Sequence, residues 1–239
     1  MDNNILKPGE RLDDLQNKGY EIIQDDNHFS FGVDAVFLSD FVRVKPKDKV
    51  LDLGTGTGIL PILIAAKTES KRIVGLEIQE TSADMAKRSV LYNHLEDRVE
   101  IKVGDIKEAS TLFCRETFNV IVTNPPYMKS GHGFSNVSDE KSIARHEILV
   151  DLEDICRESS KILPEKGTLF MVHRPFRLTE IIYKMKKYHI EPKRIKFIHS
   201  YIDDEPKLVL IEGLKGGNSG VKIEPPVVMY ERSNKGKSD

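Results

Sequence analysis

The sequence has few cysteines, no long apolar run and no large net charge, and each of these absences narrows its function. Cys114 and Cys156 lie far apart and form no CxxC pair, so neither a disulfide framework nor a zinc site is expected. No apolar run reaches the roughly 20 residues that a spanning helix needs, and no basic region with an apolar core opens the chain. We therefore expect a cytoplasmic protein with no metal and no membrane partner.

The small net charge limits the kind of partner. Lys and Arg number 36 against 38 for Asp and Glu, which gives a net charge of −2 over 239 residues. Because the chain as a whole is not a polycation, a nucleic acid would have to be held by a local basic patch. Hydrophobic residues make up 39% of the chain, which suits an α/β domain with a proper core.

Short strand-like runs alternate with longer helix-like runs along most of the chain. The expected strands are 49–53, 72–77, 98–103, 118–123 and 168–173, with a closing pair at 193–199 and 207–212. The expected helices are 33–42, 59–66, 80–95, 145–163 and 177–188. This alternation predicts a Rossmann-like α/β fold, with a doubly wound, mostly parallel seven-stranded sheet and an antiparallel closing strand. We expect an irregular N-terminal arm over 1–28 with one strand at 20–24, a main domain over 29–232 and a disordered tail over 233–239.

A glycine-rich turn connects the first strand of the main domain to the helix that follows it. Gly54, Gly56 and Gly58 would let the backbone approach a ligand at the helix N-terminus, and a dinucleotide site also uses such a turn. The spacing, however, is G-x-G-x-G, and Asp52 lies just before it. Its carboxylate would repel a pyrophosphate and attract the cationic amino-acid head of S-adenosylmethionine (SAM). The turn therefore favours SAM over NAD.

Further acids end the next two strands. Ligands of open α/β sheets bind at the carboxyl ends of the strands. Glu77 is expected there to accept both hydroxyls of a ribose, and Asp105 to accept from the exocyclic amine of the cofactor's adenine. Ile78 can cover one face of that adenine, and the segment from Phe31 to Asp34 can reach over the cofactor. The alternative interpretation is a solvated strand end for each acid and a core position for Ile78.

The fourth strand leads into Asn124-Pro125-Pro126-Tyr127. Two prolines cannot continue a strand ladder, so the chain must turn out of the sheet here. The side-chain carbonyl of Asn124 and the backbone carbonyl of Pro125 can each accept an N–H of one NH2 group, and Tyr127 can stack on the flat group that carries it. These two hydrogen bonds turn the nitrogen lone pair toward a methyl donor and stabilise the positive charge that develops on the nitrogen. We expect methyl transfer to an aryl or amide NH2, with all four residues in the catalytic turn and with Asn124 also among the residues that bind the cofactor.

The glycine turn and the Asn-Pro-Pro-Tyr turn together resemble the SAM-dependent amino methyltransferases, whose substrates are adenine N6, guanine N2 and the glutamine amide of release factors. Over the whole chain the sequence is more similar to the bacterial tRNA1(Val) (adenine-37-N6)-methyltransferase family. The segments that carry this similarity are 24–38, 144–147, 208–217 and 224–230. The resemblance implies SAM as cofactor and tRNA as partner, with methylation of the anticodon-loop adenine. We expect a monomer.

Other functions stay open at this point. A protein glutamine N5-methyltransferase shares the turn, but such enzymes usually carry a helical domain before the glycine turn, and the residues before Leu51 show no such pattern. An rRNA or DNA amino methyltransferase is a further alternative. A module that binds SAM and RNA without catalysis would not need Asn124.

Positive charge is concentrated between Lys166 and His199, where nine basic residues stand against two acids. We predict a track that binds phosphates and positions RNA without reading its sequence, and a solvated helix face is the alternative. The predicted contacts on this track are Lys184, Lys187, Lys193, Arg194 and Lys196. Three further predicted contacts, beside the catalytic turn, are Lys129, Arg145 and His146. An anticodon-loop base is already unpaired, so flipping it out costs less than opening a duplex.

Overall fold

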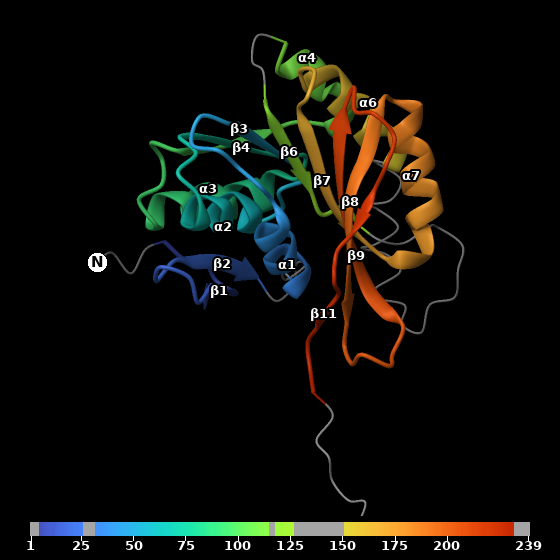
Figure 1. Ribbon diagram of the computed structural model, residues 1–239. Helices are drawn as coiled ribbons and strands as arrows, with labels where there is room; N and C mark the ends of the chain where they lie inside the picture. The colour runs from blue at the N-terminus through green and yellow to red at the C-terminus, as the bar shows by residue number, and fades with distance from the viewer. Residues whose placement is uncertain (1–4, 26–31, 115–117, 127–150, 232–239) are drawn as a thin grey trace, which may run out of the picture.

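A nine-stranded sheet with helices on both faces forms the centre of the protein (Figure 1). The structure is a computed structural model that describes residues 5–25, 32–114, 118–126 and 151–231. The sheet has the strand order β10-β8-β9-β7-β6-β3-β4-β5, and β11 also pairs with β8. Its strands are β3 (Lys49–Leu53), β4 (Arg72–Glu77), β5 (Val99–Val103), β6 (Val120–Thr123), β7 (Thr168–His173), β8 (Ile190–His199), β9 (Pro206–Lys215), β10 (Lys222–Ile223) and β11 (Val227–Val228).

Seven strands form the main sheet, and one of them is antiparallel. Strand β9 runs antiparallel to both β7 and β8, whereas the pairs among β7, β6, β3, β4 and β5 are all parallel. The antiparallel strand lies between β7 and β8, not at the edge of the sheet. The predicted Rossmann-like α/β fold is confirmed, while the two short strands β10 and β11 were not predicted.

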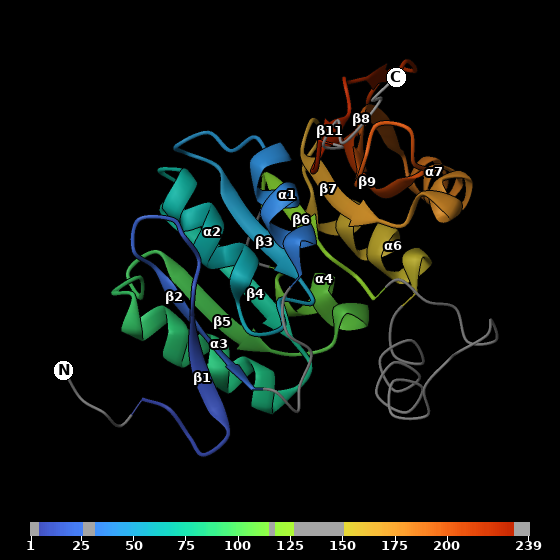
Figure 2. The same ribbon diagram turned by 90° about the horizontal axis from the view of Figure 1, so that it is seen from below.

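Side chains alternate between the two faces of the sheet, as the period of a strand requires. Val50 and Val122 belong to one hydrophobic cluster, and their neighbours Leu51 and Ile121 belong to the other. The helices divide accordingly, as Figure 2 shows. On the first face lie α1 (Val33–Phe41), α2 (Ile59–Lys67) and α3 (Glu80–Tyr92), and on the second α4 (Ala109–Leu112), α6 (Leu152–Ile162) and α7 (Leu178–Lys187). Two short 3-10 turns, η1 (Ile106–Glu108) and η2 (Pro175–Arg177), precede α4 and α7.

The N-terminal segment is an antiparallel hairpin of β1 (Glu10–Asp14) and β2 (Glu21–Asp25) that packs on α3. The Ile23 N–H donates to the Ser89 hydroxyl at 2.9 Å, and Ile22 is fully buried in the core. The predicted strand at 20–24 is therefore confirmed, but the arm is not irregular, because burial of its apolar residues orders both strands. The predicted domain boundary at residue 28 stays a prediction.

Helix α6 begins later than the sequence pattern indicated. The Asp151 carboxylate accepts the Asp154 N–H at 2.8 Å, and Asp154 accepts from the Asp151 N–H at 3.4 Å. This reciprocal capping fixes the start of the helix at Leu152, so the prediction of one helix from 145 to 163 was wrong at its start. Of the helices in the described ranges, none has the length and apolar character needed to cross a membrane.

Candidate functional site

The proposed catalytic amide and the glycine turn lie at the same edge of the sheet. Strands β3 and β6 pair in parallel, and the Thr123 hydroxyl donates to the Leu53 carbonyl at 2.8 Å where both strands end. The next residue is Asn124, which is half-buried, and Pro125 after it is buried. An amide on a stiff backbone thus stands beside the turn that leaves β3.

The glycine turn adopts a backbone conformation that favours glycine. The φ angles of Gly54, Gly56 and Gly58 are 78°, 56° and 90°, all in the left-handed region. A Cβ on Gly58 would lie 3.0 Å from the Ala86 Cβ of α3, so this glycine permits close packing of two helices. A Cβ on Gly56 would meet no atom within 4 Å, so that side of the turn has room for a ligand.

The Glu77 carboxylate sets the shape of this turn. Its two oxygens accept the N–H groups of Gly56 at 2.8 Å and of Gln79 at 2.9 Å, and the side chain is buried. Each carboxylate oxygen has a second lone pair, so the predicted contact with ribose hydroxyls is compatible with this arrangement. Asp105 is half-buried at the end of the next strand, where it accepts the Lys107 N–H at 2.8 Å and caps η1. The cofactor contacts of both acids stay predictions.

Asp52 is the most unusual group of the site. Its side chain is fully buried, and neither carboxylate oxygen has a hydrogen-bond partner within the described part of the chain. Burial raises the pKa of Asp52 to about 7. The nearby Thr55 hydroxyl acts to lower this pKa, although its geometry does not qualify as a hydrogen bond, and the negative charge of Glu77 acts to raise it further. Buried polar groups are almost always satisfied, so a carboxylate without donors fits a bound cation or donor. The ammonium and sulfonium groups of SAM meet this requirement.

A buried amide that the sequence did not single out supports the turn. Gln24 of β2 is fully buried, and its Nε2 donates to the Thr57 hydroxyl at 2.6 Å. The N-terminal hairpin therefore holds the glycine turn from outside. The residues next to Gln24 in the sequence did not indicate this role, because its partner Thr57 lies 33 residues away.

The other predicted site residues are only partly described. Asp34 in α1 and Ile78 after β4 are half-buried, and their contacts with a cofactor stay predictions. Pro126 is exposed at the catalytic turn. The predicted residues that lie outside the described ranges are Phe31, Tyr127, Lys129, Arg145 and His146.

Three of the four lysines of the predicted basic track have acidic partners from other parts of the chain. Lys184 and Lys187 of α7 both form ion pairs with Glu153 of α6, and the Tyr188 hydroxyl donates to the same carboxylate at 2.7 Å. These hydrogen bonds, with that from Lys184 the strongest, lower the pKa of Glu153 to about 2. Lys193 donates to the carbonyls of Asn218 and Gly220. The local excess of positive charge is therefore much smaller than the sequence count indicated.

Arg194 is a buried residue that connects β8 to β9, to α1 and to the C-terminal segment. Its guanidinium donates to Glu212 at 2.5 Å, to Glu224 at 3.0 Å and to the Phe41 carbonyl at 2.6 Å, and it lies 3.9 Å from the centre of the Phe41 ring. Only 7% of the residue is exposed. Because every face of the guanidinium has a partner inside the protein, we assign Arg194 a structural role in place of the predicted RNA contact.

Glu224 connects the C-terminal segment to this cluster. It also pairs with Lys196 at 3.2 Å. Burial acts to raise the pKa of Glu224, but the hydrogen bonds from Arg194 and Lys196 outweigh it and keep that pKa below its usual value. The residues after β9 are thus fixed to β8 by side chains as well as by strand pairing.

Replacing Arg194 by methionine is expected to lower the free energy of unfolding by about 3 kcal/mol, because the largely buried Glu212 loses its ion-pair partner and Glu224 loses one of its partners. Urea denaturation followed by circular dichroism measures this loss. Lys193→Met is the matched control, since Lys193 is half-buried and donates only to carbonyls. Unchanged stability with weakened RNA binding would instead restore Arg194 as an RNA contact.

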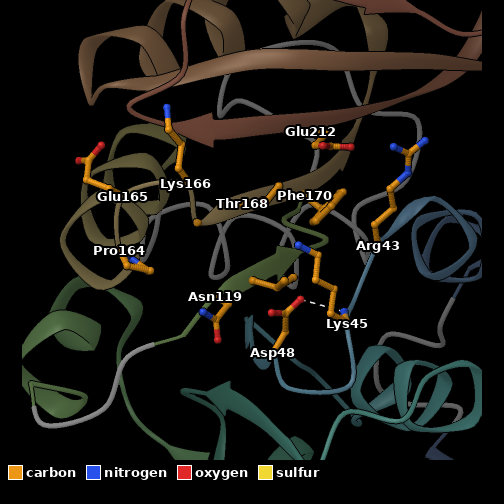
Figure 3. Close-up of a pocket in the computed structure, with 12 residues that line it drawn as sticks. Arg43, Lys45, Asp48, Asn119, Pro164, Glu165, Lys166, Thr168, Phe170 and Glu212 are labelled. Atoms are coloured by element: carbon orange, nitrogen blue, oxygen red, sulfur yellow. Dashed lines mark hydrogen bonds between the residues drawn. The ribbon is translucent and has the colours of Figure 1, made fainter.

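A cavity of about 400 Å³ lies at the opposite edge of the sheet (Figure 3). Its walls come from the residues that precede β3, β6 and β7, and from part of β9, and they include Lys45, Asp48, Asn119 and Lys166. Three cations and three carboxylates line it in equal number, so it has no preference for a charged ligand. Parallel sheets bind ligands at their carboxyl ends, and this cavity lies at the amino ends. We therefore assign no function to it.

The sequence is similar to known proteins over most of its length. Residues 20–188 match the family described as "Methyltransferase small domain". A protein of Porphyromonas gingivalis named tRNA1(Val) (adenine(37)-N6)-methyltransferase is 28% identical over 82% of this chain and 78% of its own. A protein of the same name from Bacteroides thetaiotaomicron is 29% identical over 82% of this chain and 81% of its own.

Solved structures show the same fold. A crystal structure of a predicted O-methyltransferase from Agrobacterium tumefaciens has a TM-score of 0.67 and 22% identity, over 84% of this chain and 89% of that one. TrmN from Thermus thermophilus has a TM-score of 0.54 and 17% identity, over 76% of this chain and 48% of that one. At these identities the similarity establishes the architecture and leaves the substrate to other evidence.

Proposed function

This chain belongs to the methyltransferase small domain family, and from that premise we propose that it methylates the N6 amine of an adenine in tRNA. SAM is the methyl donor. The names of the relatives from P. gingivalis and B. thetaiotaomicron support adenine 37, the anticodon-loop base, as the target. A tRNA substrate implies action in the cytoplasm, and the expected monomer stays a prediction.

One observation carries the proposal: Asn124 and Asp52 reach the same edge of the sheet from neighbouring strands. Asp52 pairs with Val122, so the amide follows two residues beyond the level of the buried carboxylate. The donor site at the glycine turn and the acceptor site at the proline turn are therefore adjacent. This adjacency is the requirement for direct transfer between two bound molecules.

The residues of the turn would activate a weak nucleophile. SAM supplies a methyl group on a positively charged sulfur. The Asn124 side-chain oxygen and the Pro125 carbonyl each accept one N–H of the adenine amine, which aims the nitrogen lone pair at the methyl carbon. The nitrogen becomes positively charged during transfer, and the same two oxygens stabilise that charge. No strong base is needed, because the N–H acidity increases as the new bond forms.

The lysines at the surface of α7 and β8 would bind the RNA backbone by exchanging partners. Lys184, Lys187 and Lys196 each hold a carboxylate in the protein alone. Such ion pairs at partly exposed positions contribute little stability, so a phosphate can replace the carboxylate at small cost. Lys193, whose partners are two neutral carbonyls, keeps its full positive charge uncompensated. These four residues, without Arg194, form the proposed phosphate contacts of the described chain.

Labelled SAM tests the function directly. The enzyme is incubated with tRNA from cells or transcripts that lack base modifications, and the RNA is digested to nucleosides. Label in N6-methyladenosine is the expected result. Label in a release factor but not in tRNA would identify a glutamine methyltransferase, and label in guanosine would identify a guanine N2 enzyme.

Raising the salt concentration from about 50 to about 200 mM is expected to weaken RNA binding roughly ten- to a hundredfold, because phosphate contacts release counterions. Affinity for SAM should change less than about twofold, since SAM is not a polyanion and its binding releases few counterions. Filter binding measures the first and calorimetry the second. Lys187→Gln should reduce the slope of the salt dependence by about one unit. Lys71→Gln should not, because Lys71 is an exposed lysine that precedes β4 and lies outside the proposed RNA contacts. A salt-independent RNA affinity would contradict the phosphate contacts.

A further inference from the structure

Phe176 is exposed at the edge of the sheet where the reaction is proposed to occur. It lies in η2, three residues after the end of β7, and 74% of it is exposed. This is the largest exposed fraction of any large apolar side chain in the described ranges. Strand β7 pairs in parallel with β6, with Met171 opposite Thr123. Strand β6 ends at this pair and β7 ends two residues later, so the turn that carries Phe176 leaves the sheet near the point where the chain turns at Asn124.

Hydrogen bonds hold the turn in a fixed conformation. His173 is fully buried, and its Nδ1 accepts the Arg174 N–H at 2.7 Å. Burial, with a smaller effect of the Arg177 charge, lowers the pKa of His173 to about 3, so the ring is neutral and remains an acceptor at physiological pH. Arg177 donates two hydrogen bonds to Glu180, at 3.1 and 3.2 Å. Pro175, at the first position of η2, fixes one further dihedral angle.

Two cationic residues lie near Phe176. Arg174, which is half-buried, lies two residues before it, and its guanidinium donates to the Lys207 carbonyl at 3.1 Å, which brings the exposed Lys207 to the same place. A flat apolar ring on a rigid turn, beside two cations, has the features of a stacking platform for single-stranded nucleic acid. Isolated apolar residues on a surface are common, so the location and the rigidity of this ring carry the argument.

We infer that Phe176 stacks on an unpaired base of the RNA next to the target adenine, as a positioning residue that keeps the adenine at Asn124. The inference rests on the proposed function. Flipping one base out of a loop leaves its neighbours without a stacking partner, and an aromatic ring at this edge replaces that partner. The contact would tolerate any base, since every base has a flat face. It would act on binding of the RNA and leave the transfer step unchanged.

Steady-state kinetics with an unmodified anticodon stem–loop RNA tests the inference. In Phe176→Ala, KM for the RNA is expected to rise about 5- to 150-fold, while kcat stays within about twofold and Kd for SAM is unchanged. Phe176→Trp should restore KM, and Phe176→Leu, which keeps apolar area but lacks a flat ring, should not. Tyr183→Ala is the matched control, because Tyr183 is an exposed aromatic of α7 about two helical turns farther from this edge.

A fluorescent base separates stacking from other effects. With 2-aminopurine next to the target adenine, binding of the wild type should change the fluorescence, and binding of Phe176→Ala should not. An unchanged KM in Phe176→Ala, or full rescue by leucine, would overturn the stacking contact. If the wild type itself forms no N6-methyladenosine in tRNA, the proposed function fails instead, so the two failures are distinguishable.

Discussion

Replacement of Asn124 by alanine is expected to lower kcat for methyl transfer about 10²- to 10³-fold. The change removes one of the two oxygens that accept from the amine, and with it the aim of the lone pair and part of the stabilisation of positive charge. The Pro125 carbonyl remains, so some activity should persist. Asn124 is half-buried in a turn, and its loss should leave the fold intact. Single-turnover kinetics with saturating RNA and SAM isolates the transfer step.

Asn119→Ala provides a matched control for this prediction. Asn119 precedes the same strand, β6, but lies at its amino end, where its side chain accepts the Lys49 N–H at 3.1 Å. Loss of that hydrogen bond should reduce stability by about 1 kcal/mol and leave kcat unchanged. A kcat of Asn124→Ala within about threefold of the wild type would show that the turn does not activate the amine.

Replacement of Asp52 by asparagine is expected to make the cofactor-free protein more stable and the SAM complex weaker. The buried carboxylate, with a pKa near 7 in place of about 4, costs the folded state roughly 2 to 4 kcal/mol above neutral pH. Asparagine removes this cost. It also removes the negative charge that faces the cofactor, so Kd for SAM should rise roughly ten- to a hundredfold.

The pH dependence of the same carboxylate gives a second readout. Between about pH 4 and 7 the folded protein binds more protons at Asp52 than the unfolded chain does, so the free energy of unfolding falls as pH rises. SAM favours the ionised form, so its affinity should rise up to about tenfold per pH unit over this range and level off above it. In Asp52→Asn both dependences should disappear. Asp48→Asn, a half-buried acid just before the same strand, should retain them. A wild-type Kd independent of pH would exclude an ionised Asp52 as the partner of SAM.

The parts of this site that follow from local sequence were predictable. Asp52, Glu77 and Asp105 each stand at the carboxyl end of a parallel strand, and the parallel order of the sheet brings such ends together. The proline pair after β6 marked the turn, because proline cannot continue a strand ladder. A local capping box also marks the start of α6 at Asp151 and Asp154, whereas the sequence prediction had opened the helix at Arg145.

The basic track was overestimated because charge was counted within one stretch of sequence. Glu153 lies before that stretch, and Glu212 and Glu224 lie after it, yet these three carboxylates neutralise its cations in space. The tertiary partners of a charge are not visible in a local count. For the same reason the link between Gln24 and Thr57 could be found only in the structure.

The C-terminal segment covers part of one edge strand of the sheet. Strand β8 would otherwise present a ten-residue row of unpaired backbone groups to the solvent. Strand β10 pairs with it at Arg194 and Ile195, and β11 pairs at Ile198 and His199. Pro225 and Pro226 between these strands have no N–H to offer a further strand. The segment therefore leaves fewer backbone groups of β8 available to pair with a strand of a second copy. The ion pairs of Arg194 help to hold the segment in this position.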